Sequence, residues 1–346
     1  MAHSLGGVHV RPAERGPRVL RPVGLAVAVV LLALVVLLSI AVGTKSIPLG
    51  TVLDALRSPD GSEDALIVRS LRVPRTVLGL AVGSALGIAG VLMQGLTRNP
   101  LADPGILGVS AGAALAAVLG FRFGLSSPAQ TAALAAAGAA LAGGVVYALG
   151  TRGRQGATPV TLALAGVAMA FLLQGLVSAV VLLDVDSLDE YRFWNVGALA
   201  DRDLGLLPGA AVLLVAGAVL AVVVARPLDL LALGEETARG LGVAVGRARL
   251  LAAAGAVLLV GGSVALCGPL AFVGLVVPHL ARAVAGPGHR WLLAYAVVLG
   301  PLLVLGADVL GRVVVRPGEL QAGIVTAALG APFFVHLARR QRLAGL

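Results

Sequence analysis

Residues 25–38 read Leu-Ala-Val-Ala-Val-Val-Leu-Leu-Ala-Leu-Val-Val-Leu-Leu, without one charged or polar side chain. A strand of a membrane β-barrel would alternate apolar and polar residues, and this stretch does not. The surrounding range 23–43 is long enough for an α-helix to cross a bilayer, which takes roughly 20 predominantly apolar residues. The stretch therefore predicts a transmembrane helix.

The rest of the chain has the same character. It has 346 residues, 58% of them hydrophobic and 12% charged, with a mean hydropathy of +0.99, whereas soluble domains carry roughly 25% charged residues. We predict an all-α integral membrane protein with about ten spans. The predicted spans are 23–43, 76–97, 104–120, 130–149, 159–183, 206–225, 249–268, 271–285, 291–311 and 321–338. Because Pro278 and His279 interrupt the eighth, we expect it to be short or broken.

The first span also has features of a signal peptide. Basic residues precede it, and Ala41-Val42-Gly43 resembles a small-residue cleavage site. Its apolar run exceeds the roughly 7–15 residues of a signal peptide, so we interpret it as a retained anchor. Arginines outnumber acidic residues in one set of alternate segments, which predicts that both termini are cytoplasmic. The expected organisation is a tail (1–22), a transmembrane domain (23–338) and a second tail (339–346).

Composition excludes several functions. Cys267 is the only cysteine, so neither a disulfide within the chain nor a cysteine-based metal site is expected. The only lysine, Lys45, follows Thr44, so no Gly-Lys-Ser/Thr phosphate loop exists and the chain is not itself an ATPase. The net charge of +9 is interpreted as a topology signal, not as nucleic-acid binding. We expect no resident metal or cofactor.

Two features predict how helices pack and where the chain docks. Gly79, Gly83 and Gly87 recur every fourth residue, which lets another helix backbone approach closely. The long inner loop 226–249 is expected to contain a short amphipathic helix with Glu235 and Glu236 near its N-terminus. A helix this short is only marginally stable by itself in water. We therefore expect it to dock on another surface.

A polar hairpin lies between the second and third spans. Asn99-Pro100 and Asp103-Pro104 stop one helix, since proline lacks an N–H and disfavours helical geometry in the residue before it. Asp103 is expected to cap the next helix. A plain turn is the alternative interpretation. The acidic segment 184–205 is expected to lie at the membrane surface.

Six motifs in order resemble the FecCD family of ABC transporter permeases, which import iron–siderophores, haem and cobalamin. The resemblance spans about residues 25–340, and its motifs are Leu71–Arg75, Gln94–Gly112, Leu164–Val167, Gly234–Val243, Phe272–His279 and Leu329–Phe334. One departure is Glu319–Gly323, where the family commonly has proline before a small or branched residue and glycine.

The resemblance implies a ten-helix type II importer permease in a bacterial inner membrane. The expected partners are a second permease copy or a paralogue, an extracytoplasmic substrate-binding protein and two copies of a cytoplasmic ATPase, on which ATP and Mg²⁺ are bound. It also implies that the loop 226–249 couples to the ATPase, with a solvated loop as the alternative. The coupling residues so implied are Glu235, Glu236, Ala238, Leu241 and Gly242.

Arg72, Arg75 and Arg312 are implied to contact acidic residues of the binding protein. The alternative for Arg72 and Arg75 is phosphate anchoring at the bilayer surface. For Arg312 the alternative is an i,i+4 pair with Asp308, which we expect to be structural and not a proton relay.

The family places the translocation path along the fifth span and a cytoplasmic gate before it. Gln174 and Ser178 are path candidates, with interhelical hydrogen bonding as the alternative, and Thr158 is the gate candidate, with a plain turn as the alternative. His279, after Pro278, is expected to be a satisfied packing residue and not a metal ligand.

The leading hypothesis is thus alternating access driven by a separate ATPase. The expected cargo is a ferric siderophore, because siderophores are the most frequent cargo in the family, and haem and cobalamin are the alternatives. An ion-coupled secondary transporter would need carboxylates near the midplane, where only Asp308 comes close. An intramembrane hydrolase would need a constellation such as His-Glu-x-x-His, which the five scattered histidines do not form.

Overall fold

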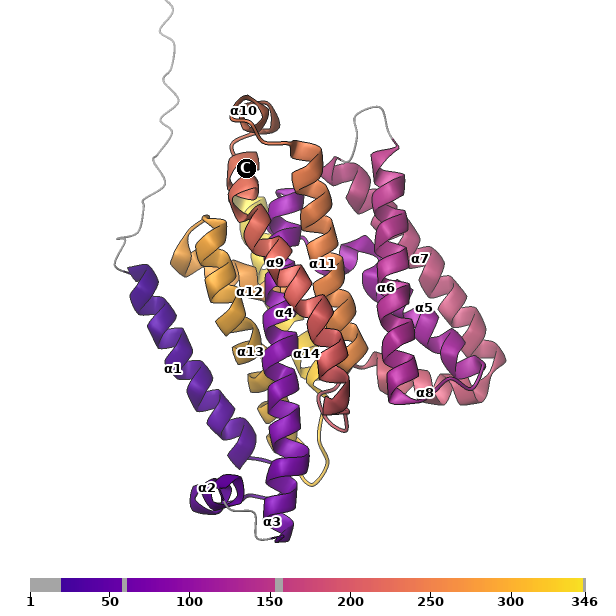
Figure 1. Cartoon of the computed structure of the whole chain (residues 1–346), viewed down its shortest axis with the longest axis vertical. Helices are drawn as coiled ribbons and strands as arrows, with labels where there is room; N and C mark the ends of the chain where they lie inside the picture. Colours follow the sequence, from indigo (N-terminus) through magenta and orange to yellow (C-terminus); the bar gives the residue numbers. More distant parts are fainter. Residues whose placement is uncertain (1–19, 58–60, 153–157, 345–346) are drawn as a thin grey trace, which may run out of the picture.

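The computed structural model describes residues 20–57, 61–152 and 158–344, and all regular structure in these ranges is helical (Figure 1). Seven described helices are long and apolar enough to cross a membrane. They are α1 (Leu20–Ala41), α4 (Val73–Thr97), α6 (Pro128–Thr151), α7 (Pro159–Leu183), α9 (Leu207–Leu231), α11 (Val245–Cys267) and α13 (His289–Val314). Three helices have shorter apolar stretches: α5 (Val109–Arg122), α12 (Val273–Ala285) and α14 (Ala322–Ala344).

Each of these helices falls on one predicted span, so the prediction of an all-helical membrane protein is confirmed. The expectation of a short eighth span is also met, because α12 has only 13 residues and contains Pro278. Of the predicted tails, residues 1–19 and 345–346 lie outside the described ranges, while 20–22 and 339–344 belong to α1 and α14.

Short helices mark the two ends of the molecule (Figure 1). At one end, here called the α10 end, α10 (Glu235–Gly240) joins α9 to α11, and the C-terminus lies nearby. The opposite end, here called the α8 end, carries most of the remaining short elements. They are α2 (Leu49–Arg57), α3 (Glu63–Leu66), the π-helix η1 (Ile67–Arg72), α8 (Val185–Asn195) and the 3₁₀-helix η3 (Leu204–Leu206). A further 3₁₀-helix, η2 (Pro104–Leu107), precedes α5.

The core of the bundle is the contact of α4 with α13. A Cβ added at Gly83 would lie 2.6 Å from the Pro301 backbone, and one added at Gly87 would lie 2.8 Å from the Ala296 carbonyl oxygen. Since these distances are shorter than van der Waals contact, only glycine allows the two backbones to approach this closely. The close packing predicted from the glycine spacing is confirmed.

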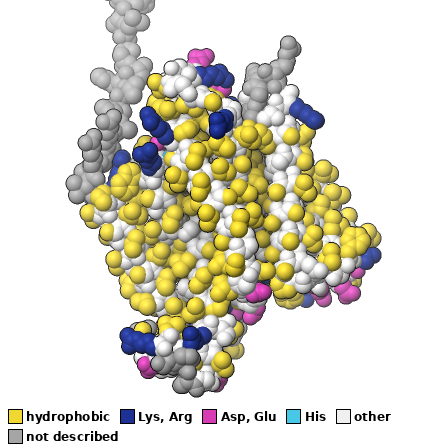
Figure 2. Space-filling model, viewed as in Figure 1, with side chains coloured by type: hydrophobic (Ala, Val, Ile, Leu, Met, Phe, Trp, Pro, Cys, Tyr) yellow, Lys and Arg dark blue, Asp and Glu magenta, His cyan; other side chains and the backbone are white. Residues whose placement is uncertain are grey.

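The outer helices contact the rest of the protein over a small part of their surface. Only 11% of the most apolar window of α1, and of α7, is buried in the chain, against 78% for the helix that contains α4. In Figure 2, hydrophobic side chains cover the middle of the visible face, and charged side chains gather toward the two ends. This distribution matches a bilayer around the middle and water or headgroups at both ends.

One predicted boundary is wrong. Residues 226–231 are not part of a loop, because α9 continues to Leu231 with Pro227 inside it, and α11 already begins at Val245. Proline is tolerated inside membrane helices when neighbouring groups satisfy the freed backbone. The connection between the two long helices is therefore compact and holds the single short helix α10.

We predict that Gly83→Ala lowers the stability of the purified protein by about 1–3 kcal/mol, because the added methyl group forces α4 away from α13. The measurement is thermal unfolding in detergent. Gly144→Ala in α6 is the matched control, since nothing lies within 4 Å of a Cβ there. An unchanged midpoint for Gly83→Ala would contradict the role assigned to this contact.

Candidate functional site

The α10 region, residues 232–244 between α9 and α11, projects from the bundle and is held to it by an ion pair. The Glu235 carboxylate accepts hydrogen bonds from Arg239 Nη2 at 2.6 Å and from Arg249 Nη2 at 2.7 Å. Arg249 belongs to α11, and its side chain is 6% exposed. Ala238 is fully buried, so α10 is fixed to the bundle at two points.

The pKa of Glu235 lies below its usual value of 4.5, chiefly because Arg249 donates a hydrogen bond to the carboxylate. A carboxyl whose pKa falls on folding stabilises the fold above its unfolded pKa and loses that contribution as the pH drops through the folded value. The link between α10 and α11 is therefore complete at neutral pH.

The other residues predicted for this region lie on its surface. Glu236 and Leu241 are exposed, and 58% of the Leu241 surface is accessible. Gly242 has a φ of +83°, a left-handed conformation that favours glycine and lets the chain turn into α11. The α10 region thus presents an apolar side chain on a short helix that is anchored to the bundle.

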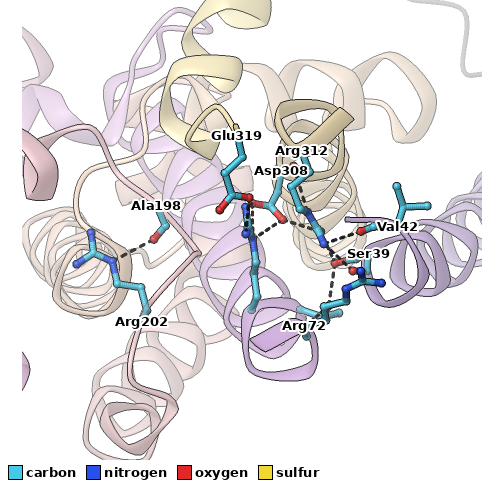
Figure 3. A network of polar contacts seen from close by, with 10 residues as sticks. Ser39, Val42, Arg72, Ala198, Arg202, Asp308, Arg312 and Glu319 are labelled. Carbon is cyan, nitrogen blue, oxygen red and sulfur yellow. Dashed lines mark hydrogen bonds and ion pairs between the residues drawn. The ribbon is translucent and has the colours of Figure 1, made fainter. Parts of the chain in front are cut away.

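At the α8 end, charged side chains form a buried cluster around Asp308 (Figure 3). Asp308 is fully buried on α13, and its carboxylate accepts from Arg75 Nη2 at 2.7 Å and from Arg312 Nη2 at 2.8 Å. Arg75 also donates to Glu319 at 2.9 Å. The expected pair of Arg312 with Asp308 is present, and Arg75 is a second partner of Asp308 that spacing along one helix did not indicate.

The same cluster caps the end of α1. Arg72 Nη1 donates to the carbonyl oxygens of Ile40 and Ala41, and Arg312 Nη1 donates to those of Ser39 and Val42. The last carbonyls of a helix have no partner within it, and in a membrane protein they need donors from elsewhere. These arginines supply the donors and join α1 to η1 and α13.

The docking role predicted for Arg72, Arg75 and Arg312 stays a prediction. Arg72 and Arg312 are 5% and 3% exposed, and each donates to groups of this chain. Any contact with another protein would compete with these internal hydrogen bonds. The geometry accounts for all three side chains as structural groups.

The polar hairpin adopts the predicted turn. Asn99 Oδ1 accepts from the Leu101 N–H at 2.9 Å, and Asp103 Oδ1 accepts from the Gly105 N–H at 2.8 Å. The helix that Asp103 caps is the short 3₁₀-helix η2, which begins with Pro104, and α5 follows it. The hairpin thus reverses the chain at the end of α4, within the expected boundaries.

The candidates on the fifth span lie on one poorly covered helix. Thr158 is the N-cap of α7, and its hydroxyl forms a capping box with Thr161. Gln174 and Ser178 are exposed on the surface of this chain. Both side chains are accessible, and Gln174 also has a side-chain hydrogen bond with Tyr191 of α8, as its interhelical alternative predicts.

His279 differs in one respect from expectation. Its ring packs edge-on against Phe333 with the centroids 5.5 Å apart, as expected of a packing residue. Its Nδ1 is buried without a hydrogen-bond partner, so the expectation that the side chain is fully satisfied is wrong for this atom. Among the described residues, no group of three or more His, Cys, Asp or Glu side chains is placed to hold a metal ion.

Sequence reasoning also missed a contact at the α10 end. His289 at the start of α13 contacts Asp229 of α9, with 2.6 Å between Nδ1 and Oδ1, and its backbone N–H donates to the same oxygen. The two residues are 60 positions apart, and no local pattern links them. The contact joins the last turn of α9 to the first turn of α13, next to the α10 region.

The structure is that of a polytopic helical membrane protein with a short helix anchored at one end. Comparison with known proteins agrees. The FecCD transport family model matches residues 31–340. The chain belongs to this family, which comprises the permease subunits of ABC importers, and it is a multi-pass inner-membrane protein.

Relatives with known names cover nearly the whole chain. The ferric enterobactin transport system permease protein FepD of Escherichia coli is 45% identical over 94% of this chain and 98% of its own length. The hemin transport system permease protein HmuU of Yersinia pestis is 39% identical over 79% of this chain and 83% of its own.

A solved structure has the same fold. It is an inward-facing conformation of a metal-chelate type ABC transporter, with a TM-score of 0.81 and 28% identity, covering 92% of this chain and 99% of that one. The family, the relatives and the fold agree on a transport component.

We predict that Asp308→Asn lowers the stability of the protein by about 3–5 kcal/mol, because it leaves the buried Arg312 without a counter-charge and Arg75 with only the partly exposed Glu319. Glu319→Gln is the control and should cost less than about 1 kcal/mol, since that carboxylate is 35% exposed. Thermal unfolding in detergent measures both. Weaker capture of the binding protein by Asp308→Asn at an unchanged unfolding midpoint would assign the cluster to docking instead.

Proposed function

We propose that this chain moves a ferric siderophore across the inner membrane through a path at the axis of a permease dimer. A separate ATPase dimer supplies the energy at the α10 end, and a substrate-binding protein delivers the cargo at the α8 end. In this orientation the α10 end is cytoplasmic. The chain carries no phosphate loop, so ATP and Mg²⁺ bind to the partner.

The observation that carries the proposal is the anchoring of α10. Its buried Ala238 and the Glu235–Arg249 ion pair connect it to the bundle, while Leu241 stays exposed. A lever that transmits force from another protein needs a rigid attachment and an accessible contact, and this element has both. ATP-driven closure of the ATPase would then move α10 and α11 together.

The face of α7 is the proposed dimer surface. Phe171, Leu172 and Leu176 are exposed on it together with Gln174 and Ser178. A Cβ at Gly175 would meet nothing within 4 Å, so the surface has room for a second helix. In a dimer that pairs these faces, the two polar side chains border the central path, and Thr158 at the start of α7 borders its cytoplasmic gate.

The ion-coupled alternative has less support. Its candidate carboxylate, Asp308, is enclosed by Arg75 and Arg312, and both of its oxygens accept hydrogen bonds from these side chains.

The names of the relatives support a ferric siderophore as the cargo. The protein named for ferric enterobactin shares 45% identity with this chain, the Bacillus subtilis Fe(3+)-citrate import system permease protein YfmD shares 40%, and the protein named for hemin shares 39%. We therefore expect uptake of radioactive iron as a ferric siderophore into proteoliposomes that contain the full transporter. Faster uptake of haem or cobalamin than of any ferric siderophore would reassign the cargo.

We predict that Leu241→Asp abolishes stimulation of ATP hydrolysis by the binding protein and lowers ATPase affinity by about tenfold or more, as expected for an exposed apolar anchor. Phe123→Asp, an exposed apolar residue at the α8 end, is the control and should retain ATPase binding. Gly242→Arg should give the same loss, but its positive φ adds strain to the turn. Normal stimulation in Leu241→Asp would contradict coupling through this region.

A further inference from the structure

A groove lies between α9 and α11 at the α10 end. Its volume is about 370 Å³, and the connection from α10 to α11 closes one side of it. Four apolar side chains and two arginines characterise its lining: Val223, Leu230, Val243, Leu251, Arg226 and Arg247. Among the described residues, the side chains that line the groove include no acidic one.

Helix geometry places the two arginines at the edge of the membrane-facing surface. Along α9, Val215, Val219 and Val222 are exposed at helical spacing, and Arg226 follows Val222 by one turn. On α11, Arg247 precedes Leu251 by one turn. Residues four apart lie on the same side of a helix, so Arg226 stands at the end of an apolar stripe on α9 and Arg247 lies on the same side of α11 as Leu251.

These two arginines differ from their neighbours in being unpaired. Arg239 and Arg249 both bond to Glu235. Within the described part of the chain, neither Arg226 nor Arg247 has a hydrogen bond or ion pair through its side chain, and both are exposed. Figure 2 shows basic side chains at this margin of the hydrophobic face, near α10.

We propose that this groove binds one anionic phospholipid from the leaflet at the α10 end. The phosphate of the headgroup lies between Arg226 and Arg247, and an acyl chain follows the apolar side chains toward the middle of the bilayer. Guanidinium groups form strong, charge-assisted hydrogen bonds to phosphate oxygens. Basic pockets between membrane helices on the cytoplasmic side are typical sites for anionic headgroups.

The bound lipid would brace the α10 region. Leu241, Gly242 and Val243 line the same groove, so an occupied groove restrains the connection that leads from α10 into α11. The lipid would therefore favour the arrangement in which α10 is held for its partner. Binding itself rests only on the groove and its charges and does not depend on the proposed cargo or on the ATPase.

The test is a lipid titration of the purified, delipidated protein in detergent, followed by native mass spectrometry. Phosphatidylglycerol is the anionic probe, and phosphatidylcholine of the same chain length is the neutral comparison. We expect a one-to-one phosphatidylglycerol adduct that the double variant Arg226→Ala/Arg247→Ala binds at least about fivefold more weakly, since a single basic residue near the headgroup is worth about fivefold in affinity. Arg226→Lys/Arg247→Lys should retain most of the affinity, because it keeps both charges.

Arg152→Ala is the matched control, since Arg152 is an exposed arginine at the end of α6, away from the groove. Circular dichroism and thermal unfolding establish that each variant is folded. Equal phosphatidylglycerol affinity in the wild type and the alanine double variant would overturn the proposal, as would equal affinity for phosphatidylcholine.

Two further outcomes would also overturn it. Displacement of the lipid by millimolar inorganic phosphate would show that the groove is a free anion site. Loss of ATPase co-purification in the double variant, with lipid binding unchanged, would assign both arginines to the protein partner. Because the lipid titration contains neither ATPase nor cargo, its failure leaves the transport function untouched.

Discussion

The contact between the α4 and α13 backbones is the constraint on which the rest of the structure depends. Inside a bilayer there is little hydrophobic gain from bringing two apolar helices together, so close packing and polar contacts have to hold them. Gly83 and Gly87 allow the approach to Pro301 and Ala296, and the other membrane helices are arranged around this pair. Larger side chains at these positions would remove the central contact.

Ion pairs at both ends of the molecule add to the stability that close helix packing provides. At the α8 end, Asp308 holds Arg75 and Arg312, and Arg312 together with Arg72 caps the open carbonyls of α1 and fixes that peripheral helix to the core. At the α10 end, Glu235 joins a six-residue helix to α11. A helix so short has little stability of its own, so its position is decided by this ion pair and by burial of Ala238.

Two groups of arginines contrast in their partners. Those around Asp308 bond within the chain, whereas in the described part of the chain the side chains of Arg226 and Arg247 beside α10 have no hydrogen bond or ion pair. Unpaired cations at a membrane edge attract anionic groups, and here they flank an apolar groove that leads to the α10 connection. The region proposed to transmit force therefore lies next to the proposed lipid-binding groove.

The sequence alone determined the class of this protein, because spans of about 20 apolar residues can satisfy their backbone in a bilayer only as helices. It also identified the Gly79–Gly83–Gly87 face, the Asp103 cap and the short α12, since each depends on residues close together in the chain. The tertiary structure alone decided that Arg75 shares Asp308 with Arg312, that Arg72 caps α1, and that Asp229 meets His289. These partners are separated by 31 to 233 positions, and only the packing of distant helices brings them within reach of a hydrogen bond.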